Sequence, residues 1–395
     1  MRRSAISLVF PLLTASLVSL AALAGCGGGG AKVVKTTGPA ALPPANPAAV
    51  GKMVQGVVAA KEGQRDRAVA LLKEAIAIDA NLWEAHYDLG IVLASTGDLA
   101  GAEPELKEAH KIAPEMQDVV VGLAEVQRRR GEHKDAANLL GEFVDAHPLA
   151  LEARTLLVAA LRNSGQVGKA ITQAREVLVR KPGDAQALAE LALCHLAQGE
   201  RDTAQLLAKQ AIDANQKSAV AHRAMGLVHL GNGDDALAFQ EFLRASQEDP
   251  RDTTARLNMG TVLLKAGAYA KAEEQFRAII QVSPDDIEAQ LGLAAALRGL
   301  SDAKSPGRLE EAKTILTKVL DKDPHNIAAL FNLGVLYADF LKRPADAAPL
   351  FKRFISDAPS DHPSRADADK YLSATSTAAD KPAPPPATPP KPGGK

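Results

Sequence analysis

The chain has 395 residues, of which 46% are hydrophobic, 24% are charged and only 4% are aromatic, and its 46 Lys and Arg almost balance its 47 Asp and Glu. The apolar fraction excludes wholesale disorder, and the near-zero net charge argues against a nucleic-acid binder, which usually carries a clear basic excess. The length suggests two or three domains, whereas the shortage of aromatic side chains favours a core of Ala and Leu between many closely packed helices.

Residues 1–25 have the pattern of an export signal. Arg2 and Arg3 precede an uncharged run of apolar and small residues from Ala5 to Ala24. An uncleaved membrane anchor is the alternative, since about 20 apolar residues are enough to cross a bilayer. Small residues close the run where an anchor would carry a flanking charge, which favours cleavage and export by the general secretion route.

The end of this run, Leu23-Ala24-Gly25-Cys26, resembles the lipobox of bacterial lipoproteins. The resemblance implies cleavage before Cys26 and a covalent lipid on that residue, which is the one non-protein group that we expect. In that family an Asp after the Cys often retains the protein at the inner membrane, so Gly27 implies the outer membrane. Several acyl chains on one residue give stable anchoring. We therefore expect an outer-membrane location with the folded part facing the periplasm.

Residues 26–48 are expected to form the lipidated Cys and a flexible tether. Four glycines follow Cys26, and the stretch after them is rich in Gly, Ala, Pro and Thr, a composition typical of flexible linkers. Acylation uses Cys26 and leaves Cys194 as the other cysteine, so no disulfide framework is expected.

The middle of the chain repeats every 34 residues. Glycines keep this spacing at Gly63, Gly97, Gly131, Gly165, Gly199, Gly233 and Gly267. Alanines keep it five residues later, at Ala68, Ala102, Ala136, Ala170, Ala204, Ala238 and Ala272. Prolines fall in the same phase at Pro114, Pro148, Pro182, Pro250 and Pro284. Such periodicity is typical of a repeat architecture built from one supersecondary unit.

This pattern resembles the tetratricopeptide repeat, which implies an all-α, right-handed α-solenoid of helix-turn-helix units. We number each repeat from 1 to 34, beginning at Ala49. Apolar residues at positions 4, 7, 8 and 11 form the buried stripe of helix A, and small residues at 8 and 20 allow close helix contact. Gly at 15 forms the turn, and Pro at 32 ends helix B.

Nine repeats span residues 49–361, with six extra residues near 301–307 and one near Pro344. Residues 362–374 are expected to form the capping helix that stacked repeats require. The Pro-rich tail, 375–395, is expected to be disordered. It would be a solvated spacer, or alternatively a ligand for proline-binding domains through its Pro-x-x-Pro spacings.

The sequence gives no sign of an enzyme. The repeats leave no room for a catalytic domain, and no phosphate-binding Gly-rich loop precedes a helix. His222 and His229 are seven residues apart on one helix, so they lie ~10 Å apart and cannot share a metal ion. We interpret them, with His195 and Cys194, as buried core residues, and we expect no metal, no nucleic acid and no small-molecule substrate.

The face available for binding is the concave one, which positions 2, 5, 9, 12 and 13 of helix A typically line in tetratricopeptide solenoids. In repeats five to nine these positions give an apolar groove of Leu193, Leu196, Leu227, Leu230, Leu257, Leu264, Leu291, Phe331 and Val335. The candidate polar groove residues are Glu125, Arg128, Arg129, Arg162, Asn258 and Asn332. A contiguous apolar strip indicates a partner site for an amphipathic helix or an extended apolar segment, unless tight superhelical coiling buries it.

Position 5 never carries the Lys of the carboxylate clamp that chaperone-binding tetratricopeptide proteins use, so that clamp is absent. The resemblances together imply a non-enzymatic lipoprotein scaffold that binds protein partners in a cell-envelope complex, such as gliding-motility machinery. Two alternatives stay open. One is a pilotin-like assembly factor for a type IV pilus or secretin, and the other is an adaptor that recruits a cell-wall or exopolysaccharide export enzyme.

Overall fold

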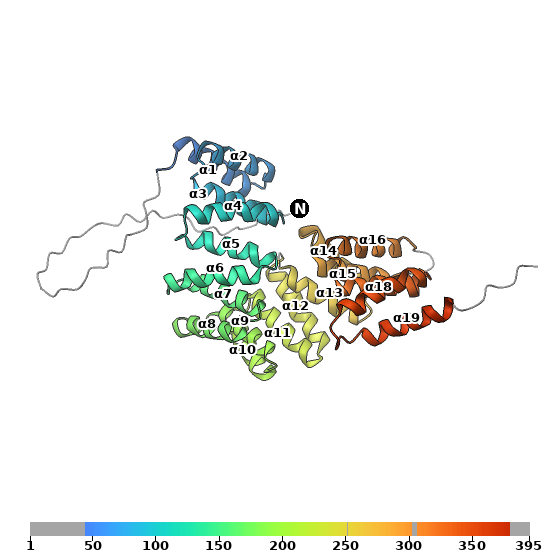
Figure 1. The fold of residues 1–395 in the computed structure, drawn as a ribbon. Helices are drawn as coiled ribbons and strands as arrows, with labels where there is room; N and C mark the ends of the chain where they lie inside the picture. Colours follow the sequence, from blue (N-terminus) through green and yellow to red (C-terminus); the bar gives the residue numbers. More distant parts are fainter. Residues whose placement is uncertain (1–43, 251, 302–305, 380–395) are drawn as a thin grey trace, which may run out of the picture. The chain divides into compact units, whose positions relative to one another are not determined.

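The computed structural model describes residues 44–250, 252–301 and 306–379 (Figure 1). These residues form α-helices and one π-helical turn, and no strand occurs among them. Helix A and helix B alternate at the predicted phase through nine repeats, so the predicted all-α solenoid is confirmed. The predicted signal segment, Cys26, most of the tether and the tail from residue 380 lie outside the described residues.

The helices fall into two compact parts, which divide between Lys169 and Ala170, inside one helix. The N-terminal part holds repeats one to three and most of repeat four. Its helices are α1 (Pro47–Lys61), α2 (Arg65–Ile78), α3 (Trp83–Ser95), α4 (Leu99–Ile112), α5 (Gln117–Arg129), α6 (His133–Ala146), α7 (Leu151–Asn163) and the start of α8 (Val167–Arg180).

The C-terminal part holds the end of α8, repeats five to nine and a last helix. Its helices are α9 (Ala185–Ala197), α10 (Arg201–Ala214), α11 (Ala219–Asn232), α12 (Asp235–Glu248), α13 (Thr253–Lys265), α14 (Tyr269–Val282), α15 (Ile287–Gly299), α16 (Pro306–Lys322), α17 (Ile327–Val335), the π-turn η1 (Leu336–Phe340), α18 (Pro344–Asp357) and α19 (Arg365–Ala379).

From α1 to α7 and from α9 to α19, each helix packs against the next along the chain, and several helices A also contact the helix A of a neighbouring repeat. The A-to-A pairs include α1 with α3 and α3 with α5 in the N-terminal part, and α13 with α15 in the C-terminal part. Side chains on helices A therefore face one another along the inner side of each stack.

The turn between helices A and B depends on the repeated glycine. All seven glycines at position 15 have positive φ angles, between 71° and 88°. This left-handed conformation lets the next amide bond back to a carbonyl five residues earlier, as Gln64 N does to Ala59 O at 2.9 Å. The predicted turn role of these glycines is confirmed.

Close packing inside a repeat couples positions 8 and 24. A Cβ atom added to Gly260 would lie 2.6 Å from the ring of Phe276, and one added to Gly90 would lie 2.6 Å from Cγ of Leu106. In repeat five both positions are Ala, and Ala192 and Ala208 are fully buried. Position 8 is thus small because position 24 of the same repeat fills its space.

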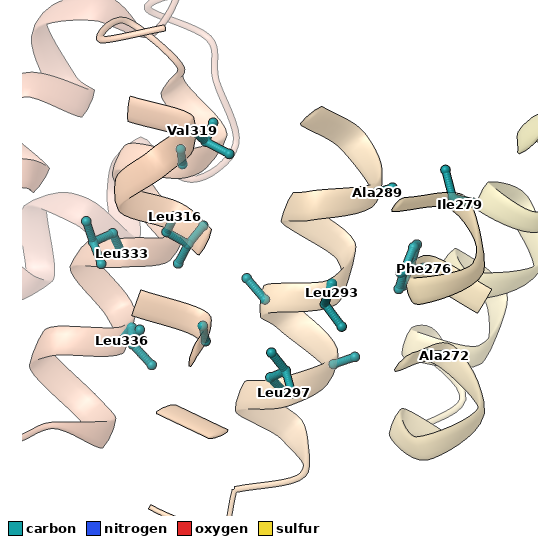
Figure 2. Close-up of a cluster of buried hydrophobic side chains, with 14 of the residues drawn as sticks. Ala272, Phe276, Ile279, Ala289, Leu293, Leu297, Leu316, Val319, Leu333 and Leu336 are labelled. Atoms are coloured by element: carbon teal, nitrogen blue, oxygen red, sulfur yellow. The ribbon is translucent and has the colours of Figure 1, made fainter. Parts of the chain in front are cut away.

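Figure 2 shows how this packing builds a core across repeats in the C-terminal part. Phe276 of α14 and Leu293 of α15 belong to one buried cluster that extends to Leu316 of α16 and Leu333 of α17. Each side chain is at most 4% exposed. At ~25 cal/mol per Å² of apolar surface, such burial supplies most of the favourable folding free energy.

A polar contact from position 4 joins successive repeats. His222 Nε2 lies 2.9 Å from the carbonyl oxygen of Gln216, which is position 32 of the preceding repeat. His86, Arg154 and Gln290 make the corresponding contact, at 3.2, 3.3 and 2.6 Å. A carbonyl left without an intrahelical partner by the end of helix B is thereby hydrogen-bonded.

Repeats eight and nine depart from the pattern. Helix α16 begins at Pro306, so part of the six-residue insertion extends helix B. The single extra residue of repeat nine does not lie near Pro344, as predicted, but earlier, because η1 absorbs it as a π-turn. Lys342 then takes the left-handed position of the glycines, with φ 55°.

Two boundaries also differ from the predicted ones. Helix α1 already begins at Pro47, capped by the Asn46 side chain, and α19 continues to Ala379 rather than ending at 374. No proline occurs between Pro363 and Pro382, so nothing breaks the helix there. Helix α19 covers the last repeat, where Tyr371 stacks on Phe351 with ring centroids 4.7 Å apart.

Candidate partner-binding site

The predicted apolar groove residues lie on helices A of the C-terminal part, and they are less exposed than the sequence suggested. Leu193 is only 5% exposed and belongs to a core cluster, so it is not a surface residue. The others are half-buried. Neighbouring helices A contact one another closely, which is the burial by coiling that the sequence left open.

These half-buried side chains sit at the edges of different core clusters. Leu257, Leu264 and Leu291 pack against the cluster of Figure 2. Leu227 packs against two other clusters, and Leu230 against one of them, whereas Leu196 belongs to none of the described clusters. The ring centroid of Phe331 lies 5.9 Å from that of Phe351 and 5.2 Å from that of Phe354, so Phe331 packs against the core of the last repeat. The predicted strip is therefore not one open surface.

A cavity of about 690 Å³ opens among repeats seven, eight and nine. It brings together two of the predicted residues, Leu264 and Val335, with side chains that sequence reasoning had missed. The further lining residues are Lys265, Tyr269, Ala295, Arg298, Gly299, Ser301 and Phe340. Most of these occupy positions 9, 12 or 13, the expected concave positions. Arg298 occupies position 12 of repeat eight, one of the expected concave positions, but as a charged residue it was not part of the predicted apolar groove.

Arg298 is the arginine among the described residues that line this cavity. Among the described residues its guanidinium makes one hydrogen bond, to Asn332 Oδ1 at 3.2 Å, and no ion pair. Its Cζ lies 5.8 Å from the ring centroid of Phe340, within cation–π range. Burial lowers the pKa of the Arg298 guanidinium, while the nearby Tyr371, Tyr269 and Asp339 oppose that shift.

The aromatic walls of the cavity are held by local geometry. A Cβ on Gly299 would lie 2.5 Å from the ring of Tyr269, so only glycine leaves room for that ring. Phe340 is 39% exposed at the end of the π-turn. Asn332, a predicted polar residue, also donates to the carbonyl of Ala328 at 3.0 Å and so orients its Oδ1 toward Arg298. Asn258 lies half-buried on α13.

The predicted polar residues of the N-terminal part are engaged with one another or with the backbone. Arg128 binds Glu125 through two hydrogen bonds of 2.8 Å on α5. Arg129 donates to the Ala94 carbonyl at 2.9 Å, at the end of α3. Arg162 on α7 lies close enough to His133 to help lower the pKa of that imidazole, after burial and Arg128.

Nearby, α3 carries a half-buried pair of carboxylates. Burial and the Glu84 charge raise the pKa of Asp88 to about 7, with Lys61 acting in the opposite direction. Burial also raises the pKa of Tyr87 to about 12, helped by the charges of Asp118, Asp88 and Glu152.

The histidines have structural contacts. His222 is 4% exposed and pairs with Glu241 at 2.7 Å, and His195 is 9% exposed and pairs with Glu200 at 2.8 Å. His229 is half-buried and Cys194 is fully buried. Among the described residues no cluster of His, Cys, Asp and Glu could hold a metal ion. In the same residues, every helix is too short or too polar to cross a bilayer.

Comparisons with known proteins identify the repeat. Two family models described as tetratricopeptide repeat match the chain, one over residues 53–116, 156–204, 190–253 and 302–362, the other over 93–161 and 227–297. The first alone covers more than half of the chain, which therefore belongs to the tetratricopeptide repeat family. A search of curated proteins gave no significant match.

Among solved structures, the APC/C hetero-tetramer Cut9-Hcn1 matches with a TM-score of 0.56 at 15% identity, over 82% of this chain and 76% of that one. A tetratricopeptide repeat protein from Parabacteroides merdae matches at 19% identity with a TM-score of 0.41, over 74% and 98% of the two chains. YrrB, described as having an unusual peptide-binding site, matches at 22% identity with a TM-score of 0.40, over 50% and 97%. At these identities the likeness concerns the fold.

Membership of this family defines the class of protein. Tetratricopeptide repeats form protein–protein interaction scaffolds that bind protein partners and are generally non-catalytic, and no enzyme family is indicated. Most residues that line the cavity around Arg298 occupy helix A positions 9, 12 and 13, the positions at which such scaffolds typically present side chains to a partner.

Proposed function

We propose that this chain is an outer-membrane lipoprotein that scaffolds a cell-envelope complex, with the cavity of repeats seven to nine as a contact point for a protein partner. The observation that carries the proposal is this cavity: a solvent-open hollow of about 690 Å³ on the concave positions, within the usual volume range of ligand sites. The lipid on Cys26 would hold the chain at the membrane, and the tether would give the solenoid reach.

The machine that we propose is of the gliding-motility type. Pilotins of type IV pili and secretins resemble this chain in combining a lipobox with tetratricopeptide repeats, but they are usually shorter than nine repeats with a Pro-rich tail. The choice rests on this analogy of architecture.

Fractionation tests the membrane part of the proposal. Replacing Cys26 with Ser should move the chain from the outer-membrane fraction to the soluble envelope fraction, and a conservative change at the next residue, Gly27→Ala, should leave it in the membrane. Persistence of the Cys26→Ser chain in membranes would sink the lipoprotein assignment.

Chemical cross-linking in intact cells, followed by detergent extraction and mass spectrometry, tests the scaffold part. Cross-links to a motor or pore component of a motility machine support the proposed function. Cross-links to a secretin alone favour the pilotin-like role, and a glycan polymerase favours the export adaptor. An absence of protein cross-links to helices A would contradict all three.

A further inference from the structure

The cavity among repeats seven to nine has an electrostatic feature that an ordinary apolar groove lacks. Arg298 is half-buried on its wall, and the described residues supply it with one amide acceptor and no carboxylate. Lys265, which also lines the cavity, is paired with Asp235 at 2.8 Å. Among the described residues, Arg298 thus lines the cavity without a carboxylate in ion-pair contact, and a partly buried charge of this kind favours binding of an anion.

The surroundings of Arg298 limit the kind of anion. Leu264, Ala295, Val335 and Phe340 give the cavity an apolar wall. Asp339 is close enough to interact electrostatically with Arg298, and its carboxylate accepts a hydrogen bond from the Tyr371 hydroxyl. One cation with a carboxylate nearby suits a single negative charge and disfavours a phosphate dianion.

Apolar side chains on the helices that line the cavity indicate that its ligand is a polypeptide segment. Half-buried Leu257 and Leu291 lie on α13 and α15, two of the helices that line the cavity, and pack on the same core cluster as Leu264. An extended apolar segment could place one side chain in the cavity and its neighbours along these leucines. A compact metabolite would leave that apolar border uncovered.

The cavity is also where the repeat pattern breaks. Phe340 is placed by the π-turn that absorbs the extra residue of repeat nine, and Ser301 stands where seven other repeats have glycine. Lys342, two residues after Phe340, adopts the left-handed conformation that is sterically unfavourable for a non-glycine residue. Strained backbone and π-turns concentrate at functional sites.

Building on the proposed protein-binding function, we propose that this cavity recognises an Asp or Glu side chain within an apolar segment of a partner protein. Arg298 supplies the ionic contact, Asn332 orients the guanidinium, and Phe340 and Tyr269 pack against the aliphatic part of the bound side chain. Gly299 keeps the cavity open by making room for the Tyr269 ring.

The test uses the purified full chain and a phage-displayed library of random 12-residue peptides. Peptides selected on the wild type are expected to carry Asp or Glu beside apolar residues. The most enriched peptide is then synthesised with its acidic residue intact and with Glu→Gln or Asp→Asn. Fluorescence anisotropy should show about 10- to 100-fold weaker binding for the amide peptide, the range expected for loss of a charged hydrogen bond.

Variants of the protein locate the contact. Arg298→Met should weaken the acidic peptide by about the same factor and leave the amide peptide unchanged. Phe340→Ala, at an exposed position, should weaken both peptides. Arg244→Met is the matched control, because Arg244 is 58% exposed on α12, pairs with Glu241 and lies off the cavity. Thermal unfolding of each variant checks that the fold is intact.

The proposal is overturned if Arg298→Met and Arg244→Met bind the acidic peptide alike, or if selection shows no acidic preference. Displacement of the peptide by phenylacetate at equal affinity would reassign the cavity to small carboxylates. Selected peptides that lack acidic residues but lose binding on Leu264→Asp would refute the acidic specificity and leave the scaffold function standing. Failure of the cellular cross-linking would refute the scaffold function itself.

Discussion

The two compact parts of this chain use the same repeat and stabilise it differently. In the C-terminal part, helices A begin with a side chain that caps them: Asp184, Ser218, Asp252, Asp286 and Asn326 each accept a hydrogen bond from a backbone amide of the first turn. In the N-terminal part, α3, α5 and α7 follow Leu82, Met116 and Ala150, which make no such bond.

The cores differ as well. Position 24 is Leu in repeats one to three, and Phe in repeats six, seven and nine. Phe242, Phe276 and Phe351 are each at most 1% exposed and face a glycine at position 8. In the N-terminal part only α1 among the helices A has such a cap, from Asn46, so we expect the C-terminal part, which carries the irregular repeats and the cavity, to be the more stable of the two. A stable surrounding core allows the strained backbone at Lys342 to persist without loss of the fold.

The largest expected effect comes from removing a core ring. Phe276→Ala should lower the free energy of unfolding by about 3–5 kcal/mol, because a large buried side chain leaves a cavity behind. Urea denaturation measures the loss, and hydrogen exchange should confine it to α13, α14 and α15. Adding Gly260→Val should restore part of the stability by refilling the space. If the double variant is as unstable as the sum of the two single changes, the pairing of positions 8 and 24 is wrong.

The second effect concerns the N-terminal part and pH. The pKa of Asp88 is raised by burial and by Glu84 to about 7, above its ordinary value of 3.8. The folded state thus favours the neutral acid, so stability should fall as pH rises between these two values and stay low above pH 7. Asp88→Asn should raise the free energy of unfolding at pH 8, by on the order of 2 kcal/mol, and flatten this dependence.

Hydrogen exchange of the α3 backbone amides, compared between pH 5 and pH 8 in the wild type and in Asp88→Asn, would measure this pH dependence of stability. The pKa of His86 is also raised, chiefly by its hydrogen bond to Glu105, and this adds a loss of stability as pH rises from about its ordinary value through the raised one. His86→Gln separates the two contributions. A pH dependence that survives both changes would contradict the assignment.

Removing a helix cap in the C-terminal part and adding one in the N-terminal part should reduce the difference in helix stability between the two parts. Asp286→Ala should destabilise α15 by about 1 kcal/mol, whereas Met116→Asp should stabilise α5 by a similar amount, since Met116 is 39% exposed and already has extended backbone angles. Exchange rates of the first-turn amides provide the measurement. If the hydrogen-exchange rates of these amides are the same in each variant as in the wild type, the caps do not account for a difference between the two parts.

The smallest effect lies at the strained residue of repeat nine. Lys342→Gly should stabilise the C-terminal part by about 1 kcal/mol, because glycine adopts a positive φ without the steric cost. Arg343 stacks over Tyr337 at 5.2 Å just after the strained residue, so Arg343→Gly serves as the adjacent control and should not stabilise. Thermal unfolding checks both. A destabilised Lys342→Gly variant would mean that this backbone is not strained.

The sequence predicted the parts of the fold that depend on local rules. Gly97 and its six counterparts mark left-handed turns, and Ala102 and its counterparts mark tight contacts, so the phase of the repeats was readable without any structure. The insertion in repeat nine was detected but misplaced, because one extra residue fits anywhere between Gly334 and Pro344, and only hydrogen bonding decides that it forms a π-turn.

The site was harder to predict because it depends on neighbouring repeats. Leu193 occupies a concave position, yet close contact between α9 and α11 buries it. Leu264 and Val335, two of the predicted groove residues, line the cavity, whereas Arg298 gains its significance from Asn332 and Phe340, which lie 34 and 42 positions along the chain. No pattern within one repeat contains that juxtaposition.

Site-specific photocross-linking in intact cells tests the central claim, that the C-terminal part binds a protein partner at this cavity. A photoreactive benzoylphenylalanine replaces Phe340 at the cavity or, as a control, Leu206, which is 58% exposed on α10. The account predicts a cross-linked partner from position 340, lost on Arg298→Met, and none from position 206. Equal cross-linking from both positions, or none from position 340, would contradict it.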